Sequence, residues 1–300
     1  MIKFAEKNNL NELKPIWKEC FSVDFYSPYG VFYICSIFQN YKTLVYVKNN
    51  KIVSMLTLLP AKLLINGQNY NGLYIWGVGT LKDYRNQNIA SEMLLFVQNY
   101  SKKSNIDFNF LVPQNYEDKL YKFYSKRGFN LNAKHKIVLL SKTQMEKLSK
   151  NNVESLKFEI GLSNSELMKL RLKNFSSCNF IHWAEDELDK VQKEYSLPEN
   201  KHVVFNFYEA QYAIIDFRNK NKLVIREMFI NKMNFKKFVR TLLEIYKDYD
   251  WFEFPLPNNS EYFDCLNIDF CYSKVAMVKQ INDDFNIDED KVYFNFALDT

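Results

Sequence analysis

The chain of 300 residues is poor in cysteine, glycine and proline. Seven glycines and seven prolines are too few for a collagen-like or linker-dominated architecture. The five cysteines are scattered, and no two of them are spaced as Cys-x-x-Cys, so neither a disulfide framework nor a zinc site is indicated. The three histidines are also far apart in the sequence, and we expect no metal site.

Long apolar segments are missing as well. The longest apolar run, residues 31–38, is interrupted by Ser36 and is far shorter than the roughly 20 residues with which a helix crosses a bilayer. The first residues, MIKFAEKNN, contain no apolar stretch of the length found in signal peptides. We therefore expect a cytoplasmic protein with no membrane partner.

Aromatic side chains are abundant, and positive charge is concentrated in one half. Aromatic residues make up 17% of the chain and hydrophobic residues 47%, which excludes disorder over most of its length. At roughly 150 residues per domain, two domains are expected. Residues 1–150 contain 21 Lys+Arg and 10 Asp+Glu, whereas residues 151–300 contain 19 and 25. The basic half suits a polyphosphorylated ligand or a nucleic acid, although a solvated surface explains the same pattern.

Hydrophobic periodicity predicts alternating strands and helices in the first half. Asn49-Asn50 and Asn66-Gly67 are typical of turns that join antiparallel strands. The order of the elements indicates an α/β or α+β fold with a mixed sheet. The predicted strands cover residues 2–4, 43–47, 52–59, 62–65, 73–80, 108–112 and 137–140, and the predicted helices cover residues 11–21, 31–39, 89–100 and 117–126.

A polar stretch rich in Lys, Asn and Ser, residues 141–155, divides the chain. We place one domain at residues 1–145 and a second at residues 153–300. Around residues 223–255 the order strand, helix, strand repeats that of the first half and suggests a diverged internal duplication. In the second half we predict helices at residues 165–173, 185–195 and 235–246, and strands at 203–207, 212–217, 223–230, 251–254, 275–278 and 293–296.

The segment from Trp76 to Ala90 carries the clearest chemical signal. A predicted strand ends there in a polar loop that opens directly onto an amphipathic helix. The first turn of a helix has backbone N–H groups without intrahelical partners, and the helix dipole adds positive potential, so such an end binds anions. Arg85 adds a charge at the rim, and the small Ala90 lets a ligand approach.

This segment resembles motif A of the GCN5-related N-acetyltransferases, the GNAT superfamily. The motif reads Arg/Gln-x-x-Gly-x-Gly/Ala, and the chain has Arg85-x-x-Asn88-x-Ala90. Downstream, the residues from Tyr121 to Phe129 resemble the family's ending Tyr-x-x-x-Gly-Phe, so the resemblance covers about residues 1–140. Asn88 replaces the first glycine. Since Asn tolerates left-handed conformations, we expect the loop to keep its shape, with a side chain near the phosphates.

The resemblance implies two GNAT-like domains in tandem and transfer of an acetyl group from acetyl-CoA to a primary amine of a small molecule. The amine would belong to a polyamine, an aminoglycoside or an amino-acid-like compound. Tyr124 would be the general acid that protonates the departing thiolate, because a tyrosine hydroxyl stays protonated at neutral pH. The implied coenzyme contacts are the backbone of Val78, Gly79 and Thr80 for the pantetheine, the loop Arg85, Asn86, Gln87, Asn88, Ile89 and Ala90 for the pyrophosphate, and Asn115.

The general base is not identified by the sequence. Asp24, in the expected loop between the first two helices, is one hypothesis. The carboxylate of Thr300 is another, by resemblance to tandem aminoglycoside acetyltransferases of the enhanced-intracellular-survival type. Acidic residues at 185–189 and 283–290 would attract a cationic amine, although such runs are more often solvated faces.

The second half lacks motif A. Residues 230–234 join strand to helix without any glycine, so we predict that this half binds no coenzyme and walls the acceptor site. Two alternatives remain open. One is an aminoacyl-tRNA-dependent peptide-bridge transferase, and the other is a catalytically silent GNAT fold that serves as a binding module. No basic helix stands out, so a nucleic-acid partner is not our first expectation.

Overall fold

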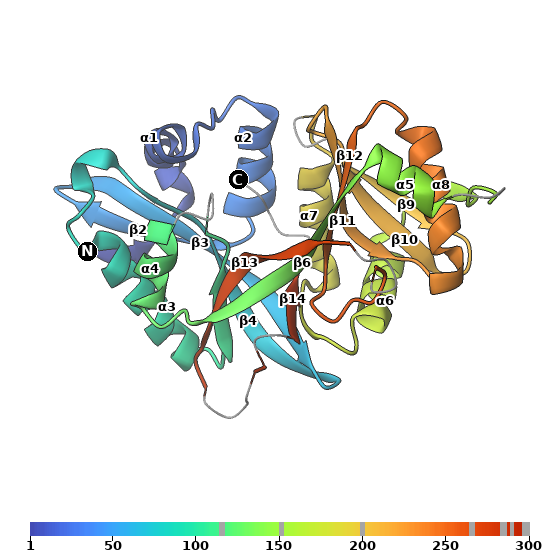
Figure 1. The fold of residues 1–300 in the computed structure, drawn as a ribbon. Coiled ribbons are helices and arrows are strands. Elements are labelled where there is room, and N and C mark those ends of the chain that lie inside the picture. The colour runs from blue at the N-terminus through green and yellow to red at the C-terminus, as the bar shows by residue number, and fades with distance from the viewer. Residues whose placement is uncertain are drawn as a thin grey trace.

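The computed structural model describes residues 1–113, 118–149, 153–198, 202–263, 268–282, 287–288 and 291–295. Figure 1 shows two lobes, with α1 to α4 in one and α5 to α8 in the other, and with β6, β13 and β14 between them. The first lobe contains β1 (Ile2–Phe4), α1 (Leu10–Phe21), α2 (Pro28–Phe32), β2 (Lys42–Lys48), β3 (Lys51–Ile65), β4 (Gln68–Thr80), α3 (Ile89–Lys103), β5 (Phe108–Leu111), α4 (Asp118–Ser125) and β6 (Leu131–Ser141).

The remaining elements follow β6 in the chain. They are α5 (Lys142–Leu148), β7 (Phe158–Ile160), α6 (Asn164–Asn174), β8 (Asn179–His182), α7 (Glu185–Tyr195), β9 (His202–Phe207), β10 (Gln211–Asp216), β11 (Lys222–Phe229), α8 (Phe235–Ile245), β12 (Trp251–Leu256), β13 (Phe270–Gln280) and β14 (Val292–Phe294). The mixed α/β architecture expected from the sequence is therefore confirmed.

One continuous mixed sheet runs through both lobes. Its main order is β1-β2-β3-β4-β5-β13-β6-β12-β11-β10-β9-β7. The long strand β6 joins the lobes, because its residues 131–138 pair with β13 while its residues 136–141 pair with β12 on the other side. Two parallel pairs, β4 with β5 and β11 with β12, occupy corresponding places in the two lobes. This repetition supports the internal duplication inferred from the sequence.

Segments late in the chain complete the sheet of the first lobe. Strand β13 lies between β5 and β6 and pairs antiparallel with both. Strand β8 pairs with β3, and β14 pairs in parallel with β8. The division into domains at residues 1–145 and 153–300 stays a prediction. Because β8 and β13 belong to the second of these segments but pair with strands of the first, the two segments share one sheet.

Turn chemistry explains the two expected hairpins. Asn49 and Asn50 have φ of 50° and 58°, and Asn66 and Gly67 have φ of 49° and 81°. Positive φ at both central residues is the condition for a type I′ turn, which matches the twist of antiparallel strands. The hairpin prediction at these positions is confirmed.

Helices cover both faces of the sheet in each lobe. One face of the first lobe packs against α1 and α2, around Trp17 and Trp76, and the other packs against α3. In the second lobe, α8 buries Phe238 and Leu242 against the strands. The polar stretch expected between the domains contains helix α5, which begins where the Ser141 hydroxyl accepts a hydrogen bond from the Gln144 backbone N–H.

Candidate active site

Strand β4 separates from β5 partway along its length. The two strands pair over residues 72–74 and 108–110, and within the described residues the later part of β4 has no strand partner on that side. A β-bulge marks the same stretch, because Gly77 and Val78 lie opposite the single residue Leu56 of β3. Gly77 adopts φ of 62°, which favours glycine. The result is a gap onto which the β4 backbone opens.

Helix α1 approaches this end of β4 closely. A Cβ atom on Gly79 would lie 3.0 Å from Ile16 Cγ2 and 3.1 Å from Phe21 Cε2, so a larger residue would crowd these two side chains. The Thr80 carbonyl accepts hydrogen bonds from Arg85 Nε at 2.9 Å and from Cys20 Sγ at 3.4 Å. Arg85 is therefore folded back along the end of β4.

The loop before α3 contains two residues in the left-handed region. Asn86 and Asn88 adopt φ of 61° and 60°, so Asn88 occupies the left-handed region as expected for the residue that replaces the motif's glycine. The Ile89 side chain is buried in the core. Gln87 accepts a hydrogen bond from Lys48 Nζ at 2.6 Å and donates one to the Asp83 carbonyl at 3.1 Å.

Tyr124 is positioned by the end of helix α4. Gly128, with φ of 85°, donates to the Ser125 carbonyl, and Phe129 donates to the Tyr124 carbonyl, which together form a Schellman motif. The motif brings the Phe129 ring edge-on to the Tyr124 ring at 6.0 Å. Burial raises the pKa of Tyr124 to about 12, although the nearby Arg127 charge opposes the shift. The hydroxyl is therefore protonated throughout the physiological range.

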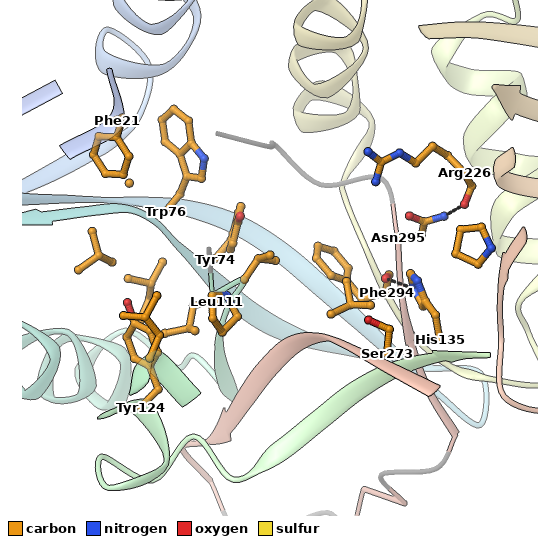
Figure 2. Close-up of a pocket in the computed structure, with 18 of the residues that line it drawn as sticks. Phe21, Tyr74, Trp76, Leu111, Tyr124, His135, Arg226, Ser273, Phe294 and Asn295 are labelled. Atoms are coloured by element: carbon orange, nitrogen blue, oxygen red, sulfur yellow. Dashed lines mark hydrogen bonds between the residues drawn. The ribbon is translucent and has the colours of Figure 1, made fainter. Parts of the chain in front are cut away.

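A cavity of about 970 Å³ joins these features to the second lobe. Figure 2 shows Tyr124, Phe21 and Trp76 at one end and Arg226 at the other, with Tyr74 and Phe294 between them. Of the residues predicted from the sequence, those that line this cavity are Val78, Gly79, Thr80, Arg85 and Tyr124.

The other predicted residues lie elsewhere. Asn86 to Ala90 form the loop and first turn at α3 and are not part of the cavity lining. Asn115 and Thr300 fall outside the described residues. Asp24 is exposed in the loop after α1, where its carboxylate accepts a hydrogen bond from the Tyr26 backbone, and it does not line the cavity.

The sequence led us to expect that the second half walls the acceptor site, but it did not identify the residues that the second lobe contributes to the cavity lining. The charged ones among these residues are Arg218, Lys222, Arg226 and Glu253, and Lys222 pairs with Glu253. No local motif marks them, because they meet only through the sheet. The single available signal was the alternation of Lys222, Val224 and Arg226 along one predicted strand.

His135 also lines the cavity and is neutral. Its Nε2 lies 2.7 Å from the Phe294 carbonyl, drawn in Figure 2, and since a carbonyl only accepts, Nε2 carries the proton. Burial lowers the pKa of His135 to about 4, although the hydrogen bond to Phe294 opposes the shift. With so low a pKa, this imidazole is a weak proton acceptor.

The acidic cluster at residues 185–189 lies apart from this cavity. Glu185, Asp186 and Asp189 border a separate, shallower depression together with Asn164 and Lys190. The second acidic run, at 283–290, is described only at residues 287 and 288.

Neither a metal site nor a membrane-spanning helix occurs in the part of the chain that the structure describes. Within it, no three His, Cys, Asp or Glu side chains come together as a metal site would require. None of its helices combines the length and apolar character that crossing a membrane demands.

Comparisons with known proteins agree with this geometry. Residues 1–131 match the model of an acetyltransferase domain of the GNAT family. A comparison with curated proteins gives no match.

Similar solved structures cover 94% of this chain in each of three cases. A protein from Enterococcus faecalis described as a probable N-acyltransferase has 12% identity, a TM-score of 0.78 and 72% of its own chain covered. A GCN5-related N-acetyltransferase from Anabaena variabilis has 14% identity, a TM-score of 0.74 and 73% covered. A tandem GNAT protein from the clavulanic acid biosynthesis pathway has 8% identity, a TM-score of 0.55 and 99% covered. Residues 1–131 therefore match a GNAT acetyltransferase domain, and the chain shares the fold of GNAT N-acetyltransferases, among them a tandem GNAT protein, over nearly its whole length.

Proposed function

We propose that the protein is an N-acetyltransferase that moves an acetyl group from acetyl-CoA to a primary amine of a small molecule. The observation that carries the proposal is the gap between β4 and β5, which opens at the Gly77 bulge and continues into the cavity that holds Tyr124. A linear thioester substrate suits such a gap, because the free backbone groups of a diverging strand can bind its amide-rich arm.

The donor would be held by the first lobe alone. The loop Arg85 to Ala90 precedes the 15-residue helix α3, whose first-turn N–H groups and dipole favour a pyrophosphate. Arg85 adds a charge that remains half-exposed in solvent. Asn88 adopts the left-handed conformation that the motif's glycine would adopt, so the loop keeps its shape. Its presence in place of glycine is therefore no reason to expect weaker donor binding. That argument favours an active enzyme over a silent binding module.

The acetyl transfer needs two proton movements. The amine nitrogen attacks the thioester carbonyl, whose oxygen would be polarised by the backbone N–H groups of β4 near Val78. The C–S bond then breaks, and Tyr124 gives its proton to the departing sulfur. The amine loses a proton to a base or to solvent.

The test separates donor binding from chemistry. Isothermal titration with acetyl-CoA is expected to give micromolar binding that Arg85→Ala weakens, while Arg240→Ala, a change of an exposed arginine on α8, leaves it unchanged. Tyr124→Phe is expected to keep donor binding and lower kcat with any accepted amine by about 100-fold or more. Absent donor binding in the unmodified protein would overturn the proposal.

A further inference from the structure

The part of the cavity remote from Tyr124 contains two nearly buried polar side chains that the proposed acetyl transfer does not use. His135 of β6 and Asn295, directly after β14, are 4% and 6% exposed, and both line the cavity. The two residues are held together, because the Phe294 carbonyl lies 2.7 Å from His135 Nε2 and Asn295 follows Phe294 in the chain. Figure 2 shows both on the far side of Phe294 from Tyr124.

The hydrogen bonds of Asn295 leave its side-chain oxygen to the cavity. Its Nδ2 donates to the Arg226 carbonyl and, at 3.2 Å, to the Tyr293 hydroxyl, so both of its N–H groups are used. The Asn295 backbone carbonyl accepts from Arg171 Nη2 at 3.2 Å, which fixes the residue from the buried side. Among the described residues, none donates to Asn295 Oδ1. An amide oxygen can only accept, so this atom needs a donor from a ligand or from water.

His135 provides a second acceptor. Since Nε2 donates to the Phe294 carbonyl, Nδ1 carries the lone pair. Burial lowers the pKa of His135 to about 4, so Nδ1 stays unprotonated at neutral pH. No group of the described residues donates to it. Neither His135 Nδ1 nor Asn295 Oδ1 is enclosed without a partner, as the Trp76 indole nitrogen is, so both atoms open onto the cavity.

Ser273 adds a hydroxyl beside these two acceptors. It lies directly opposite His135 in the antiparallel pair of β13 and β6, and it also lines the cavity. Side chains at opposite positions have Cβ atoms about 4.5–5.5 Å apart, so one ligand group can reach both. A serine hydroxyl can donate as well as accept. The polar cluster of Asn295, His135 and Ser273 therefore presents two groups that only accept and one that can donate.

This polar cluster is complementary to an uncharged group with two N–H donors. An ammonium group would leave water without a counter-charge, which is costly, because the cluster has no carboxylate and Glu253 of the cavity lining is paired with Lys222. A carboxylate has no donor and would leave Asn295 Oδ1 and His135 Nδ1 unsatisfied. A primary carboxamide has two N–H donors for these atoms and a carbonyl that accepts from the Ser273 hydroxyl.

We propose that the acceptor is an amine that also carries a primary carboxamide, and that Asn295, His135 and Ser273 bind the carboxamide while the amine lies near Tyr124. The proposal rests on the proposed acetyltransferase function. Because Phe294 lies between Tyr124 and the polar cluster in Figure 2, a chain of several atoms must separate the amine from the carboxamide. An α-amino amide such as glycinamide is too short for this arrangement.

The experiment compares linear amines that differ in one end group. Hexylamine, aminohexanol, aminohexanamide, aminohexanoate and diaminohexane are assayed with acetyl-CoA. We expect kcat/KM for aminohexanamide to exceed that for hexylamine by about 5- to 100-fold, the range for two hydrogen bonds. Aminohexanol, with one donor, should fall between them, and aminohexanoate and diaminohexane should not exceed hexylamine.

Shorter and longer homologues test the separation of the two ends. Aminobutanamide and aminooctanamide are compared with butylamine and octylamine in the same assay. Equal values for amide and alkylamine at every chain length would overturn the inference. A preference for aminohexanoate or diaminohexane over aminohexanamide would overturn it as well.

Variants locate the carboxamide site through the ratio of kcat/KM for aminohexanamide to that for hexylamine. His135→Phe removes one acceptor and is expected to lower this ratio about 5-fold or more. Ser273→Ala should lower it about 3-fold, and it keeps the inference testable if His135→Phe does not fold, because Ser273 is only partly buried. Ser176→Ala, a change of an exposed serine after α6, should leave the ratio unchanged. An unchanged ratio in Ser273→Ala and in a folded His135→Phe would overturn the assignment.

A binding measurement keeps this inference separate from the proposed function. N-acetylaminohexanamide and N-acetylhexylamine are titrated without coenzyme into protein with nitrogen-labelled histidine, and His135→Phe assigns the resonances. We expect the amide to bind more tightly and to shift the Nδ1 resonance of His135, which gains a hydrogen bond. That result would support the carboxamide site even if no amine is acetylated. Equal or absent binding of the amide would count against the site even if acetyl-CoA binds.

Discussion

At the scale of single residues, the identity of residue 88 affects the loop that would bind the donor phosphates in the proposed function. A β-branched residue in the left-handed region is strained by about 1–2 kcal/mol or more, whereas glycine is not. We expect Asn88→Gly to bind acetyl-CoA at least as tightly as the unmodified protein, and Asn88→Val to bind it about 5- to 30-fold more weakly. Titration calorimetry of the two variants measures this difference. Equal dissociation constants would mean that the phosphates do not contact this loop.

Single residues also show which parts of the candidate site a sequence motif can predict. The residues Arg85 and Tyr124 were predicted from short local patterns, and both line the cavity. Such patterns work because a helix start or a Schellman motif is defined by residues close in sequence. Arg218, Arg226 and Glu253 have no such pattern, since their meeting depends on the pairing of β10, β11 and β12.

At the scale of elements, the end of α4 sets the position of Tyr124. Gly128 holds φ of 85°, and a Cβ there would lie 3.2 Å from the flexible end of Lys279. We expect Gly128→Ala to lower the free energy of unfolding by about 1–2 kcal/mol and to reduce turnover, because the Phe129 contact with Tyr124 shifts. Gly128→Asn, which tolerates the same φ, serves as the matched comparison and should lose less. Urea titration measures the change in the free energy of unfolding, and kcat measures the change in turnover. If both were unchanged in Gly128→Ala, the argument would be contradicted.

Most elements could be predicted from the sequence, and those that could not have a physical explanation. The helix predicted at residues 185–195 has those bounds in the structure, because its apolar positions recur at helical spacing. The short strands β7 and β8 were missed, since three or four residues carry little periodicity. The position of β13 between β5 and β6 was also beyond reach, because local pattern contains no information on which distant strand is the partner.

At the scale of the whole molecule, buried histidines make stability depend on pH. Burial lowers the pKa of His135 and of His182 to about 4, whereas an unfolded histidine titrates near 6.5. As pH falls below 6.5, the unfolded state binds protons that the folded state does not, so the free energy of unfolding decreases. The slope is at most about 1.4 kcal/mol per pH unit for each histidine.

We therefore expect the free energy of unfolding to fall between pH 7.5 and 5.5, above the range in which most carboxylates titrate. His182→Gln keeps a polar side chain next to Asn69 but removes one titration, and it should reduce the fall. Urea titrations at the two pH values measure it. An unchanged pH dependence in this variant would show that His182 is not neutral in the folded protein.

Strands β8 and β13 come late in the chain but pair with β3 and β5 of the first lobe. We therefore expect the two lobes to fold together. Without β13, the fragment 1–145 would expose the edge of β5, whose residues Phe108 and Phe110 are fully buried in the whole chain. An unpaired apolar edge costs its hydrogen bonds and invites aggregation. We expect the fragment 1–145 to be unfolded or aggregated, and the whole chain to unfold in one cooperative transition.

Supplying β13 on a second fragment tests whether its absence is the reason that the fragment 1–145 does not fold. Co-expression of residues 1–145 with residues 153–300 is expected to recover a folded complex, because the second fragment supplies β13 and β8. Replacing Met277, which is buried opposite Leu111, with Asp in the second fragment should prevent that recovery. If the fragment 1–145 alone gave a cooperative unfolding transition as stable as that of the whole chain, the first lobe would be an independent domain and β13 an accessory strand. Circular dichroism and urea titration of the separate and combined fragments distinguish the two outcomes, since only a strand that completes the core makes each fragment depend on the other.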